Sequence, residues 1–405
     1  MSRKVILAIV ASALGFFVDM YDIIIFSAVR RQSLMGIGIT SADDILSKGV
    51  VLINAQMAGM LIGGFLWGMV GDKKGRLSVL FGSIIMYSLC TFLNGFATNF
   101  EQYFTLRFLA GVGLAGELGA GIALVSEQIK KEMRGYGVAF IGSLGMFGAV
   151  LGAYVGGHYD WRIAYYFGGV LGFLLLFLRM GVVESGMFKN IEHQSVRKGD
   201  LRLLFFNKRN LIKYVSIIIV GAPGWFITGI LITFTPEISK DMGMTETPSV
   251  ATVLMIMFTC FAFGDVLIGL WSQYLKSRKK AIYTFMGLSV LMIFLYFTIG
   301  RQSTTIYYWI FAGLGISAGY TITLLTLAAE QFGTNVRTLV GSSAVNLIRA
   351  SVIPLTLSFQ ILRGSFQMTI THSAILLGVI VLLLAFWAMT NLEETFGKDL
   401  DFVEE

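Results

Sequence analysis

The sequence predicts an all-α membrane protein with twelve transmembrane helices in two similar six-helix bundles. Of its 405 residues, 56% are hydrophobic and only 14% are charged, whereas about a quarter of an average soluble domain is charged. Each span needs about 20 apolar residues, so twelve spans use roughly 240 and leave enough chain for loops and one longer linker. The third observation is an internal repeat that relates the two halves of the chain.

Apolar runs of spanning length predict the helices one by one. Six are expected in the first half, at residues 5–29, 50–70, 78–97, 103–125, 137–157 and 163–183. Six more are expected at residues 211–235, 250–272, 281–299, 306–328, 340–362 and 373–389. The first run is longer than the core of a signal peptide and no small-residue cleavage site follows it, so it is interpreted as a membrane helix.

The repeat and one polar stretch divide the chain. Ala110-Gly-Val-Gly recurs as Ala312-Gly-Leu-Gly, and Glu127-Gln recurs as Glu330-Gln, at offsets of 202 and 203 residues. We therefore expect a bundle at 1–183, a linker at 184–210, a second bundle at 211–390 and a tail at 391–405. Parallel repeats of this kind place a substrate site near the middle of the membrane, between the halves.

The distribution of basic residues predicts the orientation. With a cytoplasmic N-terminus, 21 of the 31 Lys and Arg residues fall on the cytoplasmic side, seven on the other side and three within helices. This bias follows the positive-inside rule and places both termini on the cytoplasmic side of an inner membrane. Arg30 and Arg31 are the main exception. The net charge of +7 is thus interpreted as a topology signal and not as a nucleic-acid surface.

The sequence lacks the motifs that are typical of several functional classes. There is no G-x-x-x-x-G-K-[ST] motif, and His158, His193 and His372 do not have the spacing of metal ligands. Cys90 and Cys260 lie within apolar runs, and no catalytic constellation is visible. We expect no enzyme activity, no cofactor, no metal and no nucleic acid. The expected partners are a small-molecule substrate, protons and the lipid bilayer, and a monomer is expected.

One loop motif resembles a known family. Residues 68–76 read G-M-V-G-D-K-K-G-R, which resembles the G-x-x-x-D-[RK]-x-G-R motif of the major facilitator superfamily. The resemblance implies a cytoplasmic latch formed by Gly68, Asp72, Gly75 and Arg76. The alternative is an ordinary positively charged loop with a turn glycine. The second half has only a degenerate copy, in which Gln273 replaces the acid.

Other segments resemble subgroups of the same superfamily. Residues 107–119 contain Arg107, Gly111 and Gly113 and resemble the helix-four motif of metabolite, phosphate and sugar symporters. Residues 15–22, G-F-F-V-D-M-Y-D, are similar to the first helix of phosphate symporters. The tail at 394–400 resembles the P-E-T-x-G-x-x-L ending of sugar porters, with Glu393 in place of proline. These resemblances imply the major facilitator fold and transport by alternating access.

Acidic residues at membrane depth predict proton coupling. Asp19 and Asp22 lie in the first predicted helix, and Glu117 lies near the middle of the fourth. Ionisable groups at that depth are costly unless they are paired or line a wet cavity, and buried carboxyl groups can exchange protons near neutral pH. The alternative is that one of them pairs permanently with Arg107 and holds two helices together.

The second half supplies candidate substrate-binding residues. Arg349 lies in the middle of the eleventh predicted helix beside Asn346, and an arginine there can hold a carboxylate or phosphate. Its alternative is to pair with a resident acid such as Asp265. The run Gly-Ala-Pro-Gly-Trp at 221–225 should interrupt the seventh helix. The candidate pocket aromatics are Tyr21, Trp225 and Tyr320, for which packing is the alternative role.

These features predict a secondary transporter that imports a small anionic or zwitterionic metabolite by proton symport. One alternative is a proton antiporter that exports a metabolite or drug, since the same fold and similar buried acids would serve it. Another is a sensor that uses a transporter scaffold without transporting.

Overall fold

A computed structural model describes residues 3–74, 76–117, 134–179, 207–332 and 334–396. The helices of the first half are α1 (Arg3–Gly36), α2 (Ala42–Lys74), α3 (Arg76–Asn94), α4 (Phe100–Leu114), α6 (Arg134–His158) and α7 (Trp161–Arg179). Those of the second half are α10 (Lys208–Phe226), the π-helix η2 (Ile227–Ile232), α11 (Thr235–Asp241), α12 (Val250–Leu275), α13 (Arg278–Thr298), the short 3₁₀ helix η3 (Gly300–Gln302), α14 (Thr304–Ala318), α15 (Tyr320–Gln331), α16 (Thr334–Ala350), α17 (Val352–Gly364) and α18 (Ile370–Thr390).

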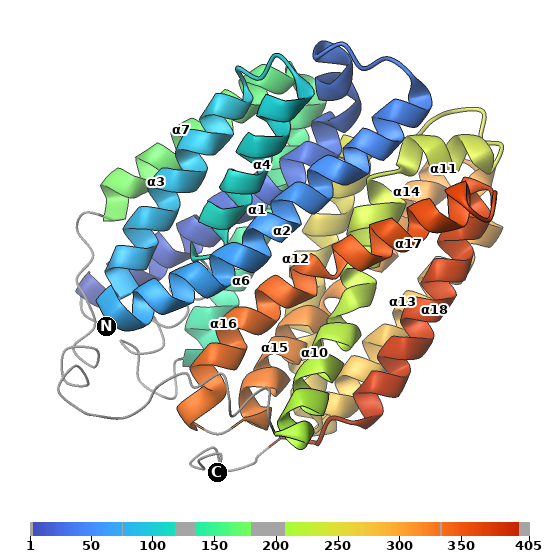
Figure 1. Cartoon of the computed structure of the whole chain (residues 1–405). Coiled ribbons are helices and arrows are strands. Elements are labelled where there is room, and N and C mark those ends of the chain that lie inside the picture. Colours follow the sequence, from blue (N-terminus) through green and yellow to red (C-terminus); the bar gives the residue numbers. More distant parts are fainter. Residues whose placement is uncertain (1–2, 75, 118–133, 180–206, 333, 397–405) are drawn as a thin grey trace.

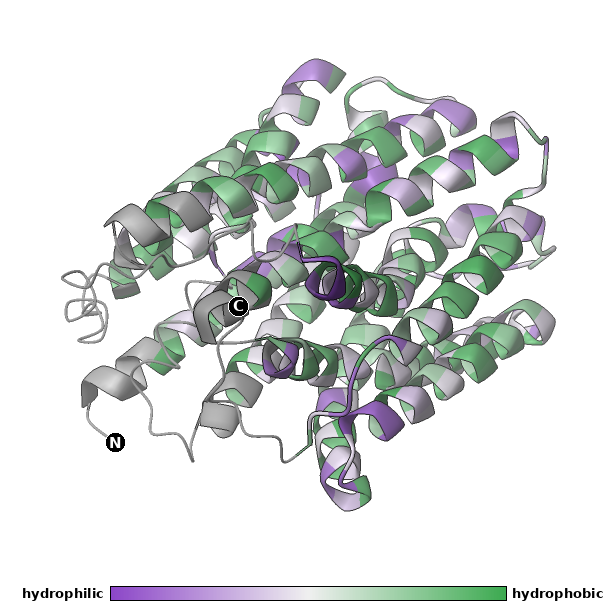
Figure 2. Cartoon of the chain, turned by 60° about the horizontal axis from the view of Figure 1, so that its bottom comes forward, coloured by the Kyte–Doolittle hydropathy of each residue, from purple (hydrophilic) through white to green (hydrophobic). Residues whose placement is uncertain are grey.

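The all-helical membrane fold predicted from the sequence is confirmed. Within the described ranges, ten helical segments are long and apolar enough to cross a membrane, and Ser78–Asn94 is a shorter apolar helix. The fourth predicted span begins with α4, and its second part lies outside the described residues, as does most of the predicted linker. Figure 2 shows hydrophobic residues along the helices and hydrophilic residues gathered at helix ends and loops.

The two halves of the chain lie side by side (Figure 1). α2 of the first half packs on α16 and α17 of the second, and α6 packs on α12. α1 begins and α18 ends at the same end of the bundle, as an even number of spans requires. We call this the inner end. The outer end is the opposite one, where α1 ends and α2 begins.

Glycines allow neighbouring helices to approach closely within the first half. A Cβ atom on Gly148 of α6 would lie 1.8 Å from the carbonyl oxygen of Phe17 in α1. A Cβ on Gly111 of α4 would lie 2.1 Å from the carbonyl oxygen of Gln56 in α2. Because small residues at a helix contact let backbones come together, these positions fix how α1 packs on α6 and how α2 packs on α4.

Three predicted spans of the second half are locally irregular helices. The predicted span 211–235 corresponds to α10 and η2, and α11 begins at its last residue; the irregularity is the π-helix at Ile227–Ile232, which directly continues α10. The sequence had suggested a break at 221–225, but α10 continues through Pro223 to Phe226. The predicted span 306–328 is irregular at Gly319 and the span 340–362 at Ser351. At Gly319 and at Ser351 the irregularity is confined to one residue, whose backbone angles stay in the right-handed helical region.

Polar contacts join the two halves at the outer end. Arg30 of α1 forms an ion pair with Glu237 of α11 at 2.7 Å, and the hydroxyl groups of Ser27 and Thr233 are 3.0 Å apart. Nearer the surface, Arg363 of α17 lies 3.7 Å from Asp43 at the start of α2. The halves are therefore in contact at this end of the structure.

Candidate functional site

A buried ion pair joins the two halves near their middle. The guanidinium nitrogen Nη2 of Arg349 in α16 lies 2.8 Å from the carboxylate oxygen Oδ2 of Asp19 in α1. The two side chains are 3% and 0% exposed. Among the described residues, Nη1 of Arg349 and Oδ1 of Asp19 have no hydrogen-bond partner. The pair therefore keeps one donor and one acceptor that a ligand could use. Arg349 thus pairs with a resident acid, as the alternative from the sequence proposed, but the acid is Asp19 and not Asp265.

Arg349 lies beside the one-residue irregularity between α16 and α17. Arg349 is in the last turn of α16, which ends at Ala350, and a cation is favourable near the carbonyl end of a helix. One turn earlier, the side-chain amide of Asn346 donates a hydrogen bond of 3.2 Å to the carbonyl oxygen of Ala115. Ala115 follows the end of α4. The end of α16 is thus tied to two helices of the other half.

A second polar chain lies within the first half. Asp22 accepts hydrogen bonds from the hydroxyl of Thr91 at 2.7 Å and from the amide of Gln56 at 3.2 Å. The amide oxygen of Gln56 in turn accepts a hydrogen bond from Nη2 of Arg107. Arg107 therefore reaches Asp22 through Gln56, and the chain joins α1, α2, α3 and α4. Nε and Nη1 of Arg107 have no hydrogen-bond partner in the described part of the chain.

Glu117 belongs to the same group of acids. Its side chain is buried, and the charges of both Glu117 and Asp22 act on Asp19. The sequence predicted Glu117 near the middle of the fourth helix. In the structure α4 ends at Leu114, so Glu117 follows the turn that ends this helix. Asp19 and Asp22 thus lie about one turn apart on α1, Asp19 lies at the contact between the halves, and Glu117 is near enough for its charge to act on Asp19.

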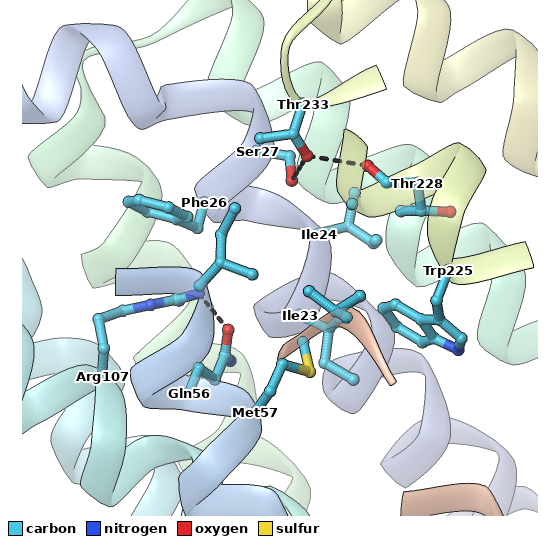
Figure 3. A pocket seen from close by; sticks show the side chains of 13 residues that line it. Ile23, Ile24, Phe26, Ser27, Gln56, Met57, Arg107, Trp225, Thr228 and Thr233 are labelled. Atoms are coloured by element: carbon cyan, nitrogen blue, oxygen red, sulfur yellow. Dashed lines mark hydrogen bonds between the residues drawn. The ribbon is translucent and has the colours of Figure 1, made fainter. Parts of the chain in front are cut away.

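A small cavity lies beside these residues and is lined by both halves (Figure 3). Arg107, Gln56, Ser27 and several apolar side chains line it from the first half. The second half contributes Trp225 together with Thr228, Gly229, Thr233 and Val352. The cavity measures about 20 Å³, which is on the order of one water molecule. A metabolite would need the halves to move apart before it could enter.

The predicted aromatic residues separate into two groups. Trp225 lines the cavity. Tyr320 does not line it, and its hydroxyl donates a hydrogen bond of 2.9 Å to the carbonyl oxygen of Val220. Tyr21 is also outside the lining, and its hydroxyl donates to the carbonyl oxygen of Ala164 at 2.8 Å. Both tyrosines thus join helices within one half.

The residues of the loop motif lie at the inner ends of α2 and α3. Gly68 and Asp72 belong to α2, and Arg76 begins α3. Gly75 lies outside the described residues. In the helix-four motif, a Cβ on Gly113 would lie 2.6 Å from the backbone nitrogen of Tyr87, so this glycine sits where α4 meets α3.

Sequence reasoning missed several polar residues of the site. Gln56 and Thr91 connect to Asp22, and Thr228 and Thr233 line the cavity. Gln56 carried a usable signal, because a glutamine inside an apolar run is expensive at membrane depth unless it is hydrogen-bonded. The threonines carried little signal, since a hydroxyl can bond to the backbone of its own helix.

The sequence model of the Major Facilitator Superfamily matches residues 5–356. The chain belongs to this superfamily. A probable 4-methylmuconolactone transporter of Cupriavidus pinatubonensis is 25% identical over 82% of the chain and 78% of that protein. The benzoate transport protein of Acinetobacter baylyi is 26% identical over 81% of the chain and 77% of that protein.

Solved structures agree with this assignment at the level of the fold. The proton:xylose symporter XylE from E. coli superimposes with a TM-score of 0.77, at 15% identity and over 98% of each chain. The major facilitator resemblance of the sequence motifs is thereby confirmed. This member of the superfamily is a multi-pass membrane transporter, and its cited relatives are transporters and not enzymes.

Proposed function

We propose that this transporter imports a small organic anion, or a zwitterion with a carboxylate, together with a proton across a bacterial inner membrane. The observation that carries the proposal is the ion pair between Asp19 and Arg349, at 2.8 Å and in the contact between the halves. Arginine can hold a carboxylate with two parallel hydrogen bonds, and Nη1 of Arg349 has no partner among the described residues.

The ion pair links the binding of anion and proton. A substrate carboxylate that takes both terminal nitrogens of Arg349 replaces the carboxylate of Asp19 at Nη2. An unpaired carboxylate in this buried place would be strongly unfavourable, so Asp19 must take up a proton when it loses the arginine. The substrate and the proton therefore bind together, which is what symport requires.

The relatives support this class of substrate. One of them is named for benzoate, which is a carboxylate at neutral pH. The fold neighbour XylE is named a proton symporter, although its low identity carries only the fold. In alternating access the halves rock around a site between them. Arg349 and Asn346 contact the other half, so a ligand that changes these contacts can also change how the halves move.

The proposal is tested with purified protein in liposomes. A thermal-shift screen of carboxylates comes first, with benzoate as the initial probe, because a ligand of the native state raises the unfolding temperature. Uptake of a hit is then measured with an alkaline interior, with and without a protonophore. Symport predicts accumulation that the protonophore abolishes. Accumulation driven by the opposite gradient would indicate antiport, and uptake indifferent to both would refute proton coupling.

Two variants separate the roles of the pair. Asp19→Asn should abolish accumulation but allow exchange of substrate, because the amide resembles the protonated acid. Arg349→Lys should weaken substrate binding and leave the remaining uptake proton-dependent, because lysine keeps the charge but not the planar fork. The exposed residues Asp160 and Arg301 provide the matched controls Asp160→Asn and Arg301→Lys. If Arg349→Ala folds poorly but its folded fraction binds substrate with normal affinity, the arginine stabilises the structure and does not bind the substrate.

A further inference from the structure

A fourth buried acid of the membrane interior takes no part in the polar chains of the site. Asp265 of α12 is 8% exposed. Neither of its carboxyl oxygens has a hydrogen-bond partner in the described part of the chain. Its neighbours along the buried face of α12 are apolar, among them Phe261, Ala262 and Ile268. A charged carboxylate is costly in such surroundings unless it is paired.

Among the described side chains, none on the helices that pack against α12 forms an ion pair or hydrogen bond with this carboxyl group. These helices are α6, α14, α13, α15, α1 and η2. The described side chains of α6 begin at Phe140. The charged or titratable groups that these helices carry in the described part are Tyr154 and His158 on α6, Tyr307 and Tyr308 on α14, Arg278, Lys279, Lys280, Tyr283 and Tyr296 on α13, Tyr320 and Glu330 on α15, and Asp19, Tyr21, Asp22, Arg30 and Arg31 on α1.

Contacts between helices show how far Asp265 lies from the inner and outer ends of the bundle. A Cβ on Gly157, near the outer end of α6, would lie 2.4 Å from the Cβ of Ala251 at the start of α12. The two helices run in opposite directions, so Asp265 lies beside residue 143 of α6. Phe17 of α1 lies beside Gly148, which places Asp19 near the level of residue 150. At 1.5 Å per residue, Asp265 is roughly 10 Å closer to the inner end than Asp19.

Asp265 also lies on a helix that must move away from the other half for release at the inner end. α12 and α6 belong to different halves and pack against each other, and the backbone of Asp265 adjoins Gly319, where the predicted tenth span is irregular. If the halves separate at the inner end, water reaches this part of α12. The carboxyl group is therefore shielded from water in the present structure and becomes accessible to water after opening.

We propose that Asp265 is a proton-binding site whose proton is held while α6 and α12 are closed and released to the inner side when they separate. The inference rests on the proton-coupled cycle proposed above. A proton is favoured over a metal cation because the described residues contain no group of three or more metal-ligating side chains, and a hard cation needs several oxygen ligands. Release into a more alkaline interior would favour inner opening and thus import.

The test measures opening of the inner end as a function of pH. Spin labels on Tyr274→Cys and Phe177→Cys, which replace exposed residues at the inner ends of α12 and α7, report the distance between the halves by pulsed electron resonance. Cys90 and Cys260 are first replaced by serine. The ratio of open to closed protein should rise with pH by up to tenfold per pH unit, the limit for one proton.

Asp265→Asn should remove this part of the pH dependence, because its amide is a permanent mimic of the protonated acid, whereas Asp265→Glu should retain it. Asp160→Asn is the matched control. An unchanged pH dependence in Asp265→Asn would overturn the proposal, as would a shift of the wild-type distances by sodium ions at constant pH that the variant lacks. Failure of the proposed function can be distinguished from failure of this inference. The liposome assay tests the proposed function separately, because it measures whether uptake responds to the proton gradient.

As a second measurement, infrared spectra of the closed protein should contain the carbonyl band of a protonated carboxyl group that Asp265→Asn lacks. The same band in both proteins would contradict the assignment. This readout needs no substrate and does not depend on transport.

Discussion

Arg30 of α1 and Glu237 of α11 hold the two halves together at the outer end. Nη2 of Arg30 lies 2.7 and 2.9 Å from the two carboxylate oxygens of Glu237 and 3.0 Å from the carbonyl oxygen of Thr233. The arginine is 1% exposed. This explains the main exception to the charge bias, because Arg30 is an internal ion-pair partner and only Arg31 is exposed.

The first prediction concerns this contact. Glu237→Gln should favour opening of the outer end, because it leaves Arg30 buried without a countercharge, at a cost on the order of 3 kcal/mol. A cysteine introduced at Ser27, which lines the cavity, should then react faster with a membrane-impermeant maleimide. Asp43→Asn is the control, since the carboxylate of Asp43 is 94% exposed and such pairs contribute little. Equal labelling in wild type and Glu237→Gln would show that the ion pair does not keep this end closed.

The second prediction concerns helix packing. Gly148→Ala should destabilise the protein by about 1–3 kcal/mol, as overpacking commonly does, because the new Cβ would lie 1.8 Å from the carbonyl oxygen of Phe17. Gly287→Ala is the control, since no atom lies within 4 Å of its Cβ position, and alanine is the better helix former by about 1 kcal/mol. Thermal unfolding in detergent measures both. If both variants shift the midpoint equally, close approach at Gly148 is not what stabilises α1 against α6.

The third prediction concerns pH. Hydrogen bonds from Arg209 and Lys213 lower the pKa of Glu393, in the tail, from 4.5 to about 2. A lowered pKa in the folded state stabilises the protein above the unfolded pKa, and that stability is lost as pH falls from about 4.5 towards 2. Wild type should therefore unfold at a slightly higher temperature than Glu393→Gln at neutral pH, and this difference should disappear in acid. The effect stays below about 1 kcal/mol, because Glu393 is 42% exposed. Arg209→Gln should act in the same direction, and a difference that persists in acid would contradict the assignment.

The fourth prediction concerns orientation. Reporter tags at residue 200 and at the C-terminus should both be cytoplasmic, and a tag near residue 40 should lie on the other side of the membrane. The expectation rests on the 21 to seven distribution of Lys and Arg. Protease protection of each tag in spheroplasts measures it. A tag at residue 200 on the outer side would refute the two-bundle arrangement with an inner linker.

The sequence by itself determined the spans, the repeat and the family. These properties depend on local apolar length and short motifs, and a run of apolar residues must form a helix in a bilayer because no water can satisfy its backbone. It also pointed to the buried acids and to Arg349, since charged residues at membrane depth are conspicuous in an apolar chain.

Only the tertiary structure decided the partners. Asp19 and Arg349 are 330 residues apart and lie in different halves, so no local pattern could distinguish their pair from one between Arg349 and Asp265. The π-helix after Phe226 in place of a break at Pro223, the role of Arg30 and the hydrogen-bonded tyrosines likewise depend on which helix faces which. A polar group in a membrane is stabilised by the particular partner that packing brings to it, and packing is a property of the whole fold.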